Sequence, residues 1–291
     1  MSCFRNFRNI QNNSFYKISK MDYFDGNAFY YKLDSFKNTA AIVGTNGSSN
    51  LIIPKSIIFQ SQEYIINAIK PNSFNSGYIV SLNFSKDSMI SFIDKDVLCK
   101  YSLEKLTIHP NLKEMKEGWN KGIKNLKNIS VSPLNKYFRY VDDKYLLTKS
   151  NINDDKDDDN SNNDNNNNDD EEIYDVLIFA RRDIVEANIP SYIKIIDSYS
   201  FENCTNLRII NFENNNQLER INKYAFSNCS NLQSIKFPSK LKEIQEKSFY
   251  ECSSLETITF DTNCELERIC SECFSNCSNL QSIKFPSKLK E

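Results

Sequence analysis

A letter-for-letter internal repeat constrains the fold more than any other feature of this 291-residue chain. Residues 226–243 read FSNCSNLQSIKFPSKLKE, and the same letters return at residues 274–291, 48 residues later. Looser copies begin at Phe201 and Phe249, so the opening phenylalanine recurs at steps of 25, 23 and 25 residues. A period of this length is typical of stacked structural units, because one unit cannot bury its apolar face alone. We therefore predict a solenoid.

The pattern inside each copy is Phe-x-x-Cys-x-x-Leu-x-x-Ile-x-Phe. Alternation at Ile235, Lys236 and Phe237 predicts a short strand with one buried face. The segment Leu-x-x-Ile-x-Phe matches the leucine-rich repeat template, with Ile and Phe in two of the Leu positions. The predicted fold class is a repeat solenoid of 23–25-residue leucine-rich repeats with short parallel strands.

A second apolar pair follows each predicted strand and indicates the return leg of the coil, on its opposite side. The pairs are Leu218/Ile221, Leu241/Ile244 and Leu266/Ile269. Charged residues between these apolar positions alternate in sign from coil to coil. Stacking in register would form one column of Glu219, Lys242, Glu267 and Lys290 and a second of Arg220, Glu243, Arg268 and Glu291. Opposite charges on adjacent strands attract, so we expect these columns to fix the register of the near-identical repeats.

The sequence divides into four predicted segments. Residues 1–69 are expected to hold an N-terminal β-cap, with strands at Phe29–Leu33, Thr39–Val43 and Leu51–Pro54 between turn-forming clusters. Degenerate repeats are predicted for residues 70–134, an inserted β-meander for residues 135–183 and regular repeats for residues 184–291.

Two further expectations concern the insert and the end of the chain. Residues 151–172 consist almost wholly of Asn and Asp, which bury too little apolar surface to offset their ordering entropy, so we expect a disordered loop. The sequence stops at residue 291 inside a repeat, and we expect a truncated solenoid because solenoid ends need polar caps.

Charge and hydropathy argue against nucleic acid as a partner and against a membrane span within this chain. The net charge is −2, but residues 154–172 hold ten acids and one lysine, a net of −9, which leaves −2 − (−9) = +7 on the remainder. Spread over a long coil, that charge is too dilute to indicate nucleic-acid binding. No stretch approaches the roughly 18 apolar residues of a membrane span, and the first twenty residues lack the apolar run of a signal peptide.

Four of the nine cysteines occupy one repeat position, namely Cys204, Cys229, Cys252 and Cys277. Side chains at one repeat position project in parallel, a poor geometry for disulfides, so we expect buried free thiols. A zinc site is one interpretation of Cys264, Cys270, Cys273 and Cys277, because Cys270 and Cys273 have the spacing of a zinc-binding pair. Cys273, however, occupies the position of Ala225 one period earlier, so we expect a core side chain and no metal site.

Catalytic machinery is not expected. His109 is the only histidine, which excludes a pair of histidines, and the Asn/Asp tract lacks the glycine that an EF-hand calcium loop requires. Trp119 stands where the repeat phenylalanine would be and is expected to fill the core. Asn203, Asn228 and Asn276 precede Cys-Ser or Cys-Thr as in glycosylation acceptors, but a role in turns is the preferred interpretation. No cofactor is predicted.

The repeats resemble those of BspA-like leucine-rich repeat proteins, a family of surface antigens in trichomonads and some bacteria. The resemblance is carried by residues 221–238, INKYAFSNCSNLQSIKFP, and by residues 189–196, IPSYIKII. Residues 135–181 are similar to the hairpin that interrupts the repeats in that family, with Asp142-Asp143 in place of the usual Asp-Gly turn. The resemblance implies a non-enzymatic adhesion role at the cell surface.

Two binding functions and one catalytic function follow as hypotheses. The first is a surface adhesin that contacts a host-cell or matrix protein or a glycan through the concave sheet; the second is a cytoplasmic protein-interaction scaffold. A carbohydrate-active enzyme is disfavoured, because acids fall on return legs opposite Lys and Arg. The predicted contact residues alternate outward on the strands: Asn211, Ser234, Lys236, Thr257, Thr259, Ser282 and Lys284.

Overall fold

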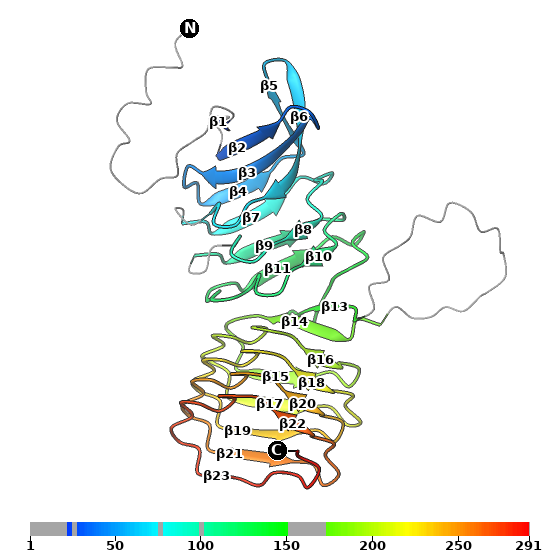
Figure 1. Cartoon of the computed structure of the whole chain (residues 1–291), viewed down its shortest axis with the longest axis vertical. Helices are drawn as coiled ribbons and strands as arrows, with labels where there is room; N and C mark the ends of the chain where they lie inside the picture. The colour runs from blue at the N-terminus through cyan, green and yellow to red at the C-terminus, as the bar shows by residue number, and fades with distance from the viewer. Residues whose placement is uncertain (1–21, 25–27, 75–77, 99–101, 151–172, 291) are drawn as a thin grey trace, which may run out of the picture.

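The computed structural model describes residues 22–24, 28–74, 78–98, 102–150 and 173–290, and these form an elongated stack of β coils (Figure 1). Every described regular element is a strand. Each coil of the C-terminal half contributes a four-residue strand to one sheet and a two-residue return leg to another, except that the final coil has only the two-residue β23 among the described strands. All pairings within these two sets of strands are parallel, which confirms the predicted solenoid.

The C-terminal half contains the regular repeats. Its longer strands, in spatial order, are β15 (Glu186–Ile189), β17 (Ile209–Phe212), β19 (Ser234–Phe237), β21 (Thr257–Phe260) and β23 (Ser282–Ile283). Its return legs are β16 (Ile195–Ile196), β18 (Arg220–Ile221), β20 (Glu243–Ile244) and β22 (Arg268–Ile269).

The N-terminal half repeats this plan less regularly. Its longer strands are β4 (Asn50–Ile53), β7 (Ser81–Phe84), β9 (Lys105–Ile108) and β11 (Asn128–Val131), and its return legs are β8 (Phe92–Ile93) and β10 (Glu114–Met115). Before them, a five-stranded sheet has the order β1 (Asp22–Phe24), β2 (Phe29–Asp34), β3 (Thr39–Thr45), β6 (Gln62–Ile69) and β5 (Ser56–Phe59).

One strand assignment made from sequence was wrong. Leu51–Pro54 was expected in the cap, but β4 pairs in parallel with β7, with Leu51 opposite Leu82 and Ile53 opposite Phe84. The physical reason is that β4 buries Leu51 and Ile53 on one face, as the repeat strands do, and its backbone hydrogen bonds go to the first repeat strand, β7. Parallel pairing therefore begins before residue 70, while the proposed four-part division stays a prediction.

A column of phenylalanine rings forms the centre of the regular repeats. The ring centroids of Phe201 and Phe226 lie 4.7 Å apart, those of Phe226 and Phe249 5.0 Å apart, and those of Phe249 and Phe274 5.5 Å apart. All three pairs are stacked, and the first three rings are fully buried. The predicted single file of rings is confirmed, because one residue type at one repeat position meets itself in the next coil.

The four repeat cysteines lie beside this column as buried free thiols. Three of the thiols donate to the carbonyl oxygen of a phenylalanine in a preceding coil. Cys229 Sγ lies 3.3 Å from Phe201 O, and Cys252 Sγ lies 3.2 Å from Phe226 O. Burial raises the pKa of both thiols, so they remain protonated donors at neutral pH.

Asparagine occupies one of the two left-handed positions in three of the four Phe-x-x-Cys turns, and Glu251, with φ of 62°, takes that position in the other. Asn203, Asn228 and Asn276 have φ values of 62°, 58° and 63°, which asparagine tolerates better than most residues. Asn228 Nδ2 also donates to Asn203 Oδ1 at 2.8 Å. The amide that a glycan would modify at Asn228 is thus used between coils, which supports the turn role.

The charge columns on the return legs are formed as predicted for three pairs. Lys242 Nζ lies 3.2 Å from Glu219, Arg268 Nη2 lies 2.8 Å from Glu243, and Lys290 pairs with Glu267. Arg220 is in register with Glu243, whereas the expected partner Glu291 lies outside the described residues. These exposed pairs contribute little stability each, but they favour one register over its neighbours.

Residues of the predicted insert form an antiparallel unit between the two halves. Its strands are β12 (Arg139–Val141), β13 (Tyr145–Thr148) and β14 (Val176–Ala180), and β14 then pairs in parallel with β16. Asp142 and Asp143, with φ of 53° and 50°, make the tight turn between β12 and β13. The Asn/Asp tract at 151–172 lies outside the described residues.

Arg182 connects the coils on either side of this insert. Its side chain is buried, and the guanidinium donates to Ile123 O at 3.1 Å, Ser200 O at 2.7 Å and Tyr199 O at 3.1 Å. It also lies over the ring of Phe179, 4.3 Å from the centroid. Because Ile123 precedes the insert and Ser200 follows it, one side chain links the two halves.

Candidate functional site

The predicted contact residues lie on the solvent-exposed side of the sheet β15-β17-β19-β21-β23, which we call the strand face. The side chains of Asn211, Ser234, Lys236, Thr257 and Thr259 are exposed, while Ile235 and Ile258 between them are buried. Each strand therefore offers two outward positions, because successive side chains alternate across a sheet.

Strand register brings these residues together in rows. Ser234 pairs with Thr257, Lys236 pairs with Thr259, and Thr257 pairs with Ser282. The side chain of Ser282 lies outside what the structure describes, and Lys284 is exposed just beyond the end of β23. The strand face thus presents rows of small hydroxyl side chains with lysines along one end.

Sequence reasoning missed Glu186 and Asn188, two outward residues of β15, the first strand of this sheet. Asn211 Nδ2 donates to Glu186 Oε1 at 2.8 Å and to Asn188 Oδ1 at 3.0 Å. The signal was present in the sequence, since Glu186-Ala-Asn-Ile189 has the alternation of a repeat strand and is followed by Pro190, as Phe237 is followed by Pro238.

The N-terminal half carries a comparable row that sequence reasoning also missed. Thr107 donates to Asn83 Oδ1 at 2.6 Å, and Ser130 donates to Thr107 Oγ1 at 3.2 Å. These side chains project from β7, β9 and β11, three neighbouring strands of one sheet. Degenerate spacing hid the row, because only the observed pairing shows which residues are neighbours.

Electrostatics on the strand face are partly balanced. Lys236 Nζ lies 2.7 Å from Asp261 Oδ1, just past the end of β21. The Lys236 side chain remains 69% exposed, so its ammonium can exchange this carboxylate for an acidic group of a partner. Ile209 adds an apolar side chain to the strand face. This side chain is half exposed, and its residue is in register with Ser234.

His109, the sole candidate for histidine catalysis, is a core residue. Its side chain is 2% exposed, and its ring packs on Phe84 with centroids 4.8 Å apart. Burial, partly opposed by the backbone of Ile90, lowers the pKa of His109 to about 4, so the ring is neutral at pH 7. A buried neutral imidazole packed against an aromatic ring cannot reach a substrate.

Acidification provides a test of this burial. A His with a lowered pKa in the folded state stabilises the fold fully above the unfolded pKa of about 6.5 and progressively less as the pH falls toward 4. We expect the free energy of unfolding to fall by about 2 kcal/mol between pH 7 and pH 5 from this residue alone. Urea unfolding at both pH values should show that loss in the parent and a smaller one in His109→Leu. Equal pH dependence in both proteins would contradict the assignment.

The cysteines do not form a metal centre within the described ranges, where no group of three or more potential metal ligands comes together. Cys264 and Cys273 are buried, and Cys264 Sγ donates to Pro238 O at 3.5 Å. Asn216 occupies the matching turn of an earlier coil and bonds Pro190 O in the same way, at 3.0 Å. Cys264 is therefore part of a turn. The described chain also contains no helix with the length and apolarity needed to cross a bilayer.

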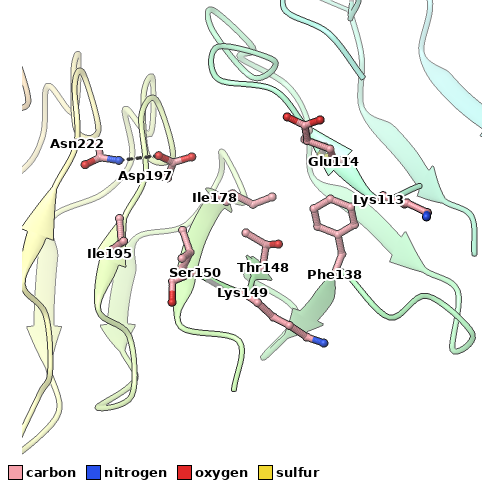
Figure 2. A pocket seen from close by; sticks show the side chains of 12 residues that line it. Lys113, Glu114, Phe138, Thr148, Lys149, Ser150, Ile178, Ile195, Asp197 and Asn222 are labelled. Atoms are coloured by element: carbon pink, nitrogen blue, oxygen red, sulfur yellow. Dashed lines mark hydrogen bonds between the residues drawn. The ribbon is translucent and has the colours of Figure 1, made fainter. Parts of the chain in front are cut away.

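A hollow of about 220 Å³ lies where the insert interrupts the return legs (Figure 2). Its apolar wall includes Met115, Phe138 and Ile178. Among its polar residues, Asp197 accepts a hydrogen bond from Asn222 at 2.8 Å, and burial raises the pKa of Asp197. Sequence reasoning did not find this hollow, because it joins residues from β10, β14 and β16.

Fold and strand face together define a leucine-rich repeat protein, a class that presents an exposed sheet of stacked coils for binding. The chain belongs to the BspA-type leucine-rich repeat family: the model of the BspA type leucine rich repeat region matches residues 54–154 and 172–291 in six copies. No curated protein sequence matches the chain significantly.

Solved structures with this fold are distant in sequence. The pneumococcal vaccine antigen PcpA is 14% identical, with a TM-score of 0.52 over 92% of each chain. A leucine-rich repeat protein from Bacteroides ovatus is 17% identical, with a TM-score of 0.50 over 90% of this chain. The present chain spans 59% of the length of the Bacteroides protein. At these identities the likeness concerns the fold alone.

Proposed function

We propose that this chain is a non-enzymatic adhesin of the cell surface, which contacts a host-cell or matrix protein or a glycan through the strand face. The observation that carries the proposal is the run of outward small polar side chains across β17, β19 and β21, flanked by lysine. Such a surface suits many weak contacts that add by multivalency, and no deep pocket is needed.

Surface location is part of the same proposal. Membership of the BspA-type family supports a surface location, because the repeats resemble those of a family of surface antigens. The similar fold of a pneumococcal vaccine antigen supports it as well. Protease treatment of intact cells tests it directly. Loss of the protein supports surface exposure, whereas survival would favour the alternative role as a cytoplasmic scaffold.

Charge reversal tests the contact surface. In a double variant with Lys236→Glu and Lys284→Glu, we expect binding to cells, matrix proteins or an array of glycans to weaken by about tenfold, because two attractive contacts at the interface become repulsive. Thr257→Arg should have a similar effect by placing a long side chain in the middle of the strand face.

A matched control lies off this surface. Lys223→Glu reverses an exposed charge on the turn after β18 and should leave binding unchanged. If the strand-face variants bind as well as this control while their unfolding midpoints are unaltered, the partner does not contact the strand face.

A further inference from the structure

Return legs in this fold are joined by a recurrent set of backbone hydrogen bonds. Two successive N–H groups of one leg donate to the same carbonyl of the preceding leg. A third N–H group, two residues later, donates to the carbonyl two residues after the first acceptor. Lys242 N and Glu243 N lie 2.9 and 3.2 Å from Glu219 O, and Gln245 N lies 2.9 Å from Ile221 O. Each leg thus offers two carbonyls to the leg that follows it.

This pattern stops at β10. The carbonyls at the two equivalent positions accept N–H groups in four other legs, where they belong to Ser91 and Ile93, Asp175 and Leu177, Lys194 and Ile196, and Lys242 and Ile244. The equivalent carbonyls of β10 belong to Lys113 and Met115, and no backbone N–H of the described chain donates to either. The cause is the insert, because the chain after β11 enters β12, which pairs with β13 and not with β10.

The side chains of β10 also lack the partners that their sequence implies. Leu112-Lys-Glu-Met115 parallels Leu241-Lys-Glu-Ile244, where the Lys242–Glu219 and Arg268–Glu243 ion pairs form with the neighbouring legs. Lys113 and Glu114 are exposed and form no ion pair with any described residue. The ammonium of Lys113 lies 5.8 Å from the ring centroid of Tyr137.

The hollow of about 220 Å³ described above lies against this free edge, where Lys113 and Glu114 line it (Figure 2). Met115 of the same strand is a third lining residue. Phe138 and Ile178 supply apolar surface beside the edge. Sites for whole drug-sized ligands are usually larger, at about 300–1,000 Å³, so this one suits a short segment of extended chain.

We propose that the free edge of β10 binds an extended peptide strand of a partner protein, with the residue order apolar, acidic, basic, apolar. Two successive N–H groups of the peptide donate to Lys113 O and a later one donates to Met115 O. Its acidic side chain faces Lys113 and its basic side chain faces Glu114. This mode of recognition adds a strand to an open edge, where backbone bonds give affinity and side chains give specificity. It is independent of the strand face.

A segment of the chain itself supplies the sequence of a test peptide for this site. Residues 217–223, QLERINK, carry the required order as Leu-Glu-Arg-Ile and make these bonds within the regular repeats. A capped, fluorescent QLERINK peptide should bind the intact chain saturably by anisotropy. The control peptide QLREINK has the same composition with the acid and base exchanged, and we expect its affinity to be about tenfold lower, because both attractive pairs become repulsive.

A reciprocal variant separates charge recognition from nonspecific binding. In Lys113→Glu with Glu114→Lys, both changes are on exposed residues, and QLREINK should become the better ligand. N-methylation of the Arg220 amide in QLERINK removes an N–H meant for Lys113 O and should weaken binding to both proteins. The strand-face variant Thr257→Arg should bind QLERINK normally.

Three results would overturn the proposal. The first is that QLERINK does not bind, and the second is that QLERINK and QLREINK bind the parent with equal affinity. The third is that the charge-exchanged protein still prefers QLERINK although its unfolding midpoint equals that of the parent. None of these results bears on the strand-face adhesin, because the assays use different surfaces.

Discussion

Replacing Arg182 with alanine is expected to lower the free energy of unfolding by about 4 kcal/mol. The substitution removes hydrogen bonds to the carbonyls of Ile123, Tyr199 and Ser200, opens a cavity beside Phe179 and leaves buried acceptors unpaired. Arg182→Lys should also be costly, because an ammonium cannot reproduce the planar fork of a guanidinium. Denaturant unfolding measures the loss.

The position of Arg182 predicts a change of shape in the unfolding curve as well as a shift. Repeat proteins unfold as coupled neighbours, so weakening one junction uncouples the segments on either side of it. We expect one unfolding transition in the parent and two in Arg182→Ala. Hydrogen exchange should accelerate most at the coils that meet at this junction.

The neighbouring residue Arg181 supplies a matched control. Its side chain is 28% exposed and forms ion pairs with Asp143 at 2.6 Å and Asp183 at 2.8 Å. Exposed pairs contribute up to about 1 kcal/mol, so Arg181→Ala should be mild. If both alanine variants lose the same small amount, Arg182 does not hold the two halves together.

Phe226→Ala is expected to cost about 4 kcal/mol, and Phe274→Ala markedly less, although both residues begin the same 18-residue sequence. Phe226 is fully buried between the rings of Phe201 and Phe249. Phe274 is half-buried and stacks on Phe249 at 5.5 Å. Removal of the fully enclosed ring leaves the larger cavity.

Chemical denaturation of the two variants in parallel provides the measurement. Because the 18 residues that begin at each phenylalanine are identical, any conformational preference intrinsic to that segment cancels in the comparison. Equal losses would mean that the stacked environment of Phe226 contributes nothing beyond its sequence, contrary to the column of rings seen in the structure.

Much of the C-terminal half was predictable because the period of the repeat fixes which residues of adjacent coils contact one another. Once the period was known, the residues at one repeat position had to meet, which correctly paired Lys242 with Glu219 and stacked Phe226 on Phe249. The outward positions of the strand face followed from the same alternation. Whether they contact a partner is a separate question that the variants above address.

The irregular features were harder to predict because they depend on contacts distant in sequence. Leu51 and Ile53 show alternation that suits a cap strand and a repeat strand equally, and only the pairing of β4 with β7 decides between them. Arg182 carries no motif, since its partners are backbone carbonyls, which every residue possesses.

The sequence by itself determined the coil, its period, the buried and exposed positions of each strand and the charge columns, because self-similar units leave few ways to bury their apolar residues. Tertiary structure alone decided how the insert joins the two halves. There the repeat is broken, neighbours are no longer fixed by the period, and the chain leaves β10 without the strand that would have followed it.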